Sequence, residues 1–60
     1  MRFREAKKLH NGDEVFIRDG RNRFHSASVV EITIDDIDDK QKNVFVRCDD
    51  GFLYHHTALK

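Results

Sequence analysis

The chain has 60 residues, enough for one small domain with a thin hydrophobic core and close to the lower limit for unassisted folding. Eleven Lys and Arg residues balance eleven Asp and Glu residues, and a net charge of zero argues against a protein devoted to non-specific phosphate binding. The single cysteine excludes an internal disulfide, and no apolar run is long enough for a membrane span or a secretion signal, so we expect a cytoplasmic protein.

The N-terminal residues 3–9 are good helix formers, with an apolar residue at every third position. Seven residues are too few for a helix that is stable on its own. Two alternatives follow, one helical turn or an extended lead-in. In both, residues 1–8 are a lead-in segment of the single domain that we expect over residues 1–60.

The first strand is predicted over residues 13–18, directly after the turn residue Gly12. Val15 and Ile17 then point to one face of the sheet, and the residues that alternate with them point to the other. Residues 19–22, Asp-Gly-Arg-Asn, predict a turn because Asp, Gly and Asn tolerate positive φ.

The second strand, predicted over residues 23–34, is long for a small domain and has apolar residues on both faces. Ala27 and Val29 belong to one period-two set, while Ile32 and Ile34 belong to the other. A bulge or sharp bend near Val29 would let both pairs face the core. The alternative is that both faces are partly covered. We prefer the bend, because a small barrel needs one long strand to cross between two short sheets.

The second half of the chain continues the alternation of strands and turns. Gly51 lies in the tightest of these turns and is expected to adopt a positive φ. The sequence predicts a loop at 35–43, a strand at 44–48, a turn at 49–51, a strand at 52–55 and a short helical turn at 56–59.

Four strands separated by turn residues predict the all-β class, as a small barrel or a strongly bent antiparallel sheet of 4–5 strands. Cys48 shares its face with apolar neighbours and is expected to be a small buried hydrophobic residue with an inert thiol. The predicted core consists of Leu9, Val15, Ile17, Ala27, Val29, Ile32, Val44, Val46, Leu53 and Leu59.

Four stretches carry a family resemblance: Gly-Asp-Glu-Val at 12–15, Ala-Ser-Val-Val-Glu-Ile at 27–32, Val-Phe-Val at 44–46 with Asp-Gly at 50–51, and Ala-Leu-Lys at 58–60. In this order they resemble the SH3-like small barrels of the Tudor and KOW type. The resemblance covers roughly the last fifty residues and bears on the fold more than on the partner.

Barrels of this type continue after the helical turn into a fifth strand, whereas this sequence stops at Lys60. Closure would therefore need the N-terminal residues, a two-residue stub or a second subunit. Residues 2–8 could fill the gap, with Phe3 over part of the core. Otherwise two copies could pair edge to edge as a homodimer, burying Phe16 or Phe45.

Catalytic and metal-binding patterns are weak in this sequence, and we expect no enzyme, no metal and no cofactor. His55 and His56 are adjacent, so on a strand they point to opposite faces, and no Cys-x-x-Cys or His-x-x-x-His spacing is present. The acidic run at 35–39 lacks the glycine and glutamate of a calcium loop. Its negative field would repel nucleic acid and attract a basic partner.

The best candidate binding surface is aromatic and basic. Tudor-like barrels cage methylated cations with outward aromatic side chains, and related barrels stack bases on them. The rings could instead cover a second small core or a dimer interface. We expect a non-enzymatic module that binds a protein partner, with binding of RNA or single-stranded DNA as the alternative and no membrane contact. The candidate binding residues are Phe16, Phe24, His25, Phe45, Tyr54, Arg18, Arg21 and Arg23.

Overall fold

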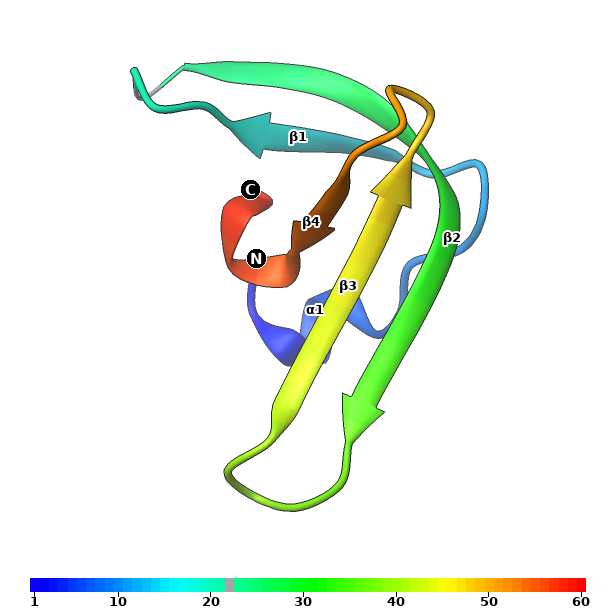
Figure 1. The fold of residues 1–60 in the computed structure, drawn as a ribbon, viewed down its shortest axis with the longest axis vertical. Coiled ribbons are helices and arrows are strands. Elements are labelled where there is room, and N and C mark those ends of the chain that lie inside the picture. Colours follow the sequence, from blue (N-terminus) through cyan, green and yellow to red (C-terminus); the bar gives the residue numbers. More distant parts are fainter. Residues whose placement is uncertain (22) are drawn as a thin grey trace.

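Four antiparallel strands form one open sheet with the order β1-β2-β3-β4, as a computed structural model of the chain shows (Figure 1). The structure describes residues 1–21 and 23–60. The prediction of a mostly β, antiparallel fold is confirmed. The elements are α1 (Phe3–Ala6), β1 (Glu14–Arg18), β2 (Phe24–Asp36), β3 (Lys42–Cys48), β4 (Leu53–His55) and the 3-10 turn η1 (His56–Ala58).

The long strand β2 is bent, as the sequence predicts. Its first half pairs with β1, its second half pairs with β3, and the register shifts between Val29 and Glu31. Val30 is therefore the extra residue of a bulge. In Figure 1 the ribbon of β2 runs beside β1, curves, and then runs beside β3.

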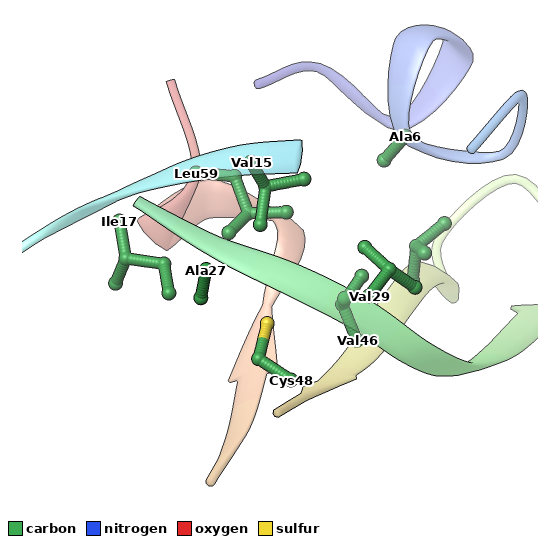
Figure 2. Packing of buried hydrophobic residues seen from close by; sticks show 9 residues of the cluster. Ala6, Val15, Ile17, Ala27, Val29, Val46, Cys48 and Leu59 are labelled. Carbon is green, nitrogen blue, oxygen red and sulfur yellow. The ribbon is translucent and has the colours of Figure 1, made fainter. Parts of the chain in front are cut away.

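The core lies on the side of the sheet that we call the inner face (Figure 2). Seven of the ten predicted core residues are buried, and Leu9 and Ile32 pack against them half-buried. The prediction for Leu53 is wrong: 51% of its surface is exposed, because its cross-strand partner Arg47 lies on the opposite, outer face. The buried apolar residues are Ala6, Val15, Ile17, Ala27, Val29, Val44, Val46, Cys48 and Leu59.

The two ends of the chain meet beside the sheet. Residues 3–6 form a helical turn rather than an extended strand, and α1 contacts β3 and η1. Phe3 packs against the core, as one predicted alternative requires, but the segment does not extend the sheet. Leu59 instead bridges to Ile17 at the edge of β1, and its carbonyl accepts a hydrogen bond from the ammonium of Met1.

The turns follow their local chemistry. Gly51 has φ +88°, as predicted, and its N–H donates to the Cys48 carbonyl at 2.9 Å. The Asp19 carboxylate accepts hydrogen bonds from the backbone N–H groups of Arg21 and Arg23, so the side chain organises the predicted turn at 19–22. The last residue of that turn lies outside the described residues. Among those described, no helix has the length and apolar character needed to cross a membrane.

Candidate binding site

Phe16 and Phe24 lie together on the outer face of the β1–β2 hairpin. Phe16 and Arg18 lie two residues apart on β1 and therefore point to the same side of the sheet. Phe24 is the cross-strand partner of Arg18, and directly paired residues also point to the same side. The exposed fractions are 45% for Phe16 and 40% for Phe24. Two large apolar side chains on one small surface are therefore open to solvent.

Two cationic side chains flank the Phe24 ring. The Arg18 guanidinium carbon lies 5.5 Å from the ring centroid, and the Lys60 ammonium lies 5.2 Å from it. Both distances fall within the range of a cation–π interaction. The backbone N–H of Lys60 also donates to the Phe16 carbonyl at 2.8 Å, which fixes the lysine beside the hairpin. We call Phe16, Arg18, Phe24 and Lys60 the hairpin face.

The remaining predicted arginines lie at the end of the same hairpin. Arg21 and Arg23 are exposed, and Asp19 holds their backbone N–H groups at 2.8 and 3.1 Å. The carboxylate offsets part of the positive charge at this end of the hairpin. The basic character predicted around the first hairpin is therefore present, with one acidic group among the arginines.

Phe45 belongs to a different and more covered part of the outer face. It is paired with Thr33 on one side and His55 on the other, and the rings of Phe45 and His55 meet edge to face with centroids 5.2 Å apart. His55 is itself held at both nitrogens, 2.7 Å from Asn43 Oδ1 and 2.8 Å from Thr57 Oγ1. Phe45 is half-buried and lies in a packed polar–aromatic cluster apart from the hairpin face.

Tyr54 and His25 point to the inner side of the sheet, because their cross-strand partners are the buried residues Val46 and Ile17. The Tyr54 hydroxyl donates a hydrogen bond of 2.6 Å to the Asp50 carboxylate. His25 Nε2 lies 4.0 Å from the same carboxylate. These two predicted site residues therefore group around Asp50, and the Tyr54 ring lies beside Phe52, with centroids 6.5 Å apart, and not in the hairpin face.

The hydrogen bond between Tyr54 and Asp50 shifts both groups in opposite directions. It raises the pKa of Tyr54 to about 12, and it lowers the pKa of Asp50, with the Phe52 backbone N–H adding to the effect. Burial raises the pKa of the neighbouring Cys48 thiol, and the charges of Asp50 and Asp49 raise it further. The hydroxyl and the thiol thus both stay protonated at neutral pH, which is unsuited to nucleophilic attack.

His56 is a buried polar residue that the sequence does not predict. Its Nδ1 accepts a hydrogen bond of 3.2 Å from the backbone N–H of Val44, so Nε2 carries the proton of the neutral ring. Burial lowers the pKa of His56. The predicted turn at 56–59 could have indicated the burial of His56. A 3-10 helix has three residues per turn, so a turn that buries Leu59 also directs His56 inward.

Of the eight predicted binding residues, the structure brings Phe16, Phe24 and Arg18 onto one surface and adds Lys60, which the sequence does not single out. Among the described residues no group of three or more His, Cys, Asp or Glu side chains is arranged to hold a metal ion. No known protein-family model, curated protein or solved structure matches this chain. Its function is therefore inferred from its own residues and their geometry.

Proposed function

We propose that this chain is a small, non-enzymatic binding module that takes a protein partner on the hairpin face. The observation that carries the proposal is the pair of exposed rings, Phe16 and Phe24, with Arg18 and Lys60 beside them. Exposed aromatic and arginine side chains are the residues that contribute most to protein interfaces.

We also propose that the fold is a small SH3-like barrel of the Tudor and KOW type. Three features support this proposal: the bulge at Val30, the short 3-10 turn after β4, and the contact of the C-terminal residues with β1. Leu59 pairs with Ile17 and Lys60 donates to Phe16, which is where the first residues of a closing fifth strand would lie. Leu59 and Lys60 would then close the barrel within one chain.

The partner that fits the hairpin face is an acidic segment with apolar side chains. Apolar groups would cover the rings, and carboxylates would pair with Arg18 and Lys60. A methylated cation is disfavoured, because the Phe24 ring already has two cations of this chain within 5.5 Å of its centroid. Net neutrality of the chain favours a protein partner over nucleic acid.

Selection from a random peptide display library tests the proposal. We expect enrichment of peptides that combine Asp or Glu with apolar or aromatic residues, and loss of their binding in Phe24→Ser. Phe52→Ser is the matched control, because Phe52 is even more exposed but is not part of the hairpin face. Enriched peptides that bind Phe24→Ser as well as the unmodified protein would contradict the proposal.

Nucleic-acid binding is the second candidate, because arginines beside exposed rings also suit stacked bases. Titration with single-stranded DNA and RNA of about 12 nucleotides, at ~50 and ~300 mM salt, separates the two. If the hairpin face binds protein, neither oligonucleotide shifts the NMR amide resonances of Phe16 and Phe24 at low salt. Oligonucleotide binding that shifts these resonances and weakens as the salt concentration rises, without enriched peptides, would replace the first candidate by the second.

A further inference from the structure

A hollow of about 470 Å³ lies beside α1 and is separate from the hairpin face, with which it shares no residue. Its volume is within the range of sites for small ligands. Residues of the N-terminal segment form one side, and the start of β3 contributes the rest. The lining residues are Arg2, Phe3, Arg4, Glu5, Lys7 and Lys42.

The hollow carries a local excess of positive charge, although the net charge of the whole chain is zero. Four basic side chains line it, against the single carboxylate of Glu5. Within the part of the chain that the structure describes, none of the ion pairs involves Arg2, Arg4 or Lys7. Lys42 lies 3.9 Å from the Asp39 carboxylate, but that carboxylate is fully exposed, and such a surface ion pair contributes little. The local excess of cations creates a field that favours an anion.

Two of these cations lie beside the ring of Phe3. The ammonium groups of Lys7 and Lys42 lie 5.6 and 5.9 Å from the centroid of its ring. The ring is anchored, because Phe3 packs against the core and meets the His56 ring edge to face at 6.1 Å. Two like charges beside one ring repel each other, and an anion bound in the hollow would relieve that repulsion.

We propose that this hollow binds a polyphosphate chain, such as that of a nucleoside triphosphate or of an inorganic polyphosphate. The guanidinium groups of Arg2 and Arg4 are suited to paired hydrogen bonds with phosphate oxygens, and lysines neutralise phosphate as point charges. The interaction of both lysines with the Phe3 ring leaves little aromatic surface for a base. Recognition is therefore by charge, and the hollow does not require a nucleobase.

An NMR titration of amide resonances with sodium tripolyphosphate, ATP and adenosine at ~50 mM salt tests the proposal. We expect tripolyphosphate and ATP to shift the amides of residues 2–7 and Lys42 with affinities within about threefold of each other. Adenosine should shift none of them, and Phe16 and Phe24 on the hairpin face should stay unchanged. Absence of binding, or shifts spread over all basic residues of the surface, would overturn the proposal. ATP binding more than about tenfold tighter than tripolyphosphate would overturn recognition by charge alone.

Single substitutions localise the binding. Lys42→Gln and Arg4→Gln should each weaken tripolyphosphate binding by about fivefold, the loss expected for one charge-assisted contact. Lys40→Gln and Lys8→Gln are the matched controls: both lysines are exposed and close in sequence but do not line the hollow. The controls should change the affinity less than about twofold. Equal losses in all four variants would mean a general charge effect and would contradict a site in the hollow.

Discussion

The two halves of β2, on either side of the bulge at Val30, have a similar alternation of residues but differ in how well their inward side chains are buried. In the first half, Ala27 is buried opposite Val15, and the outer face carries the exposed ring of Phe24. In the second half the inward residue Ile34 is 49% exposed, although its partner Val44 on β3 is fully buried. An apolar residue at an inward position is therefore not always a core residue.

The difference comes from what packs across the inner face. The 3-10 turn η1 and the helical turn α1 both contact β3, and they cover its residues. The end of β2 extends beyond that cover, so Ile34 has a buried neighbour without being buried itself. In the first half of β2, the bridge from Leu59 to Ile17 brings the C-terminal residues over the same face. Burial in so small a protein depends on two short segments at the ends of the chain.

The largest difference should appear when the two members of one register pair are each truncated to alanine. Val44→Ala is expected to lower the free energy of unfolding by roughly 2–3 kcal/mol, because it leaves a cavity in the core. Ile34→Ala removes more atoms but should cost below about 1 kcal/mol, since half of the side chain is already in water. Chemical denaturation of both variants measures the two values. Equal losses would mean that the end of β2 is covered as well as β3 is.

A second pair of substitutions compares the turn within each half of the sheet. Gly51→Val should destabilise the protein by about 1–2 kcal/mol, because a β-branched residue strains the backbone at φ +88°. Gly20→Val in the β1–β2 turn should stay within about 0.5 kcal/mol, since that glycine has open space around it and no positive φ. Thermal unfolding of both variants provides the measurement. A tolerated Gly51→Val would contradict the tight turn between β3 and β4.

Protonation of His56, which lies in the 3-10 turn that contacts β3, should make the stability of the protein depend on pH. Because its folded-state pKa is lowered from 6.5, the unfolded chain takes up a proton first as the pH falls. The stability that depends on the neutral ring is complete well above pH 6.5 and is lost as the pH falls through 6.5 towards the folded-state pKa. We expect the free energy of unfolding to decrease between about pH 7.5 and about pH 5. The decrease should be smaller in His56→Gln and unchanged in His10→Gln, whose side chain is exposed. The same decrease in both variants would assign it to other groups.

The smallest effect is on the ionisation of Tyr54, which is hydrogen-bonded to Asp50, and not on the stability of the protein. Tyr54 is the only tyrosine of the chain and there is no tryptophan, so its ionisation can be followed by ultraviolet absorbance without interference. We expect a pKa of about 12 in the unmodified protein and a value closer to 10 in Asp50→Asn. Identical titrations of the two proteins would mean that the hydrogen bond between Tyr54 and Asp50 is absent in solution.

Much of the fold could be predicted from alternation and turn chemistry. The bend of β2 followed from the conflict between Val29 and Ile32, and the turn at Gly51 followed from the need for positive φ. Leu53 was wrongly predicted to be buried, because a three-residue strand gives too few residues for the periodicity to set its faces. The helical turn α1 could not be separated from an extended lead-in, since seven residues form a helix only where tertiary packing supports it.

The candidate site was predicted in part. The outward positions of Phe16 and Arg18 followed from the strand period, but the grouping of the remaining aromatic residues depends on the curvature and register of the sheet. Period alone could not show that Tyr54 lies on the inner face or that Phe45 is covered by His55. Lys60 reaches Phe24 only through the bridge between Leu59 and Ile17, a contact between residues 42 positions apart that no local pattern contains.

The proposed function requires that the rings of Phe16 and Phe24 are open to a partner, while that of Phe45 is covered. Relaxation of the phenylalanine ring protons by a soluble paramagnetic agent, measured at low and at high protein concentration, tests it most directly. We expect strong relaxation of Phe16 and Phe24, weak relaxation of Phe45, and no change with concentration. Protection of Phe16 and Phe24 that grows with concentration would contradict the claim, because it would place the hairpin face inside a homodimer.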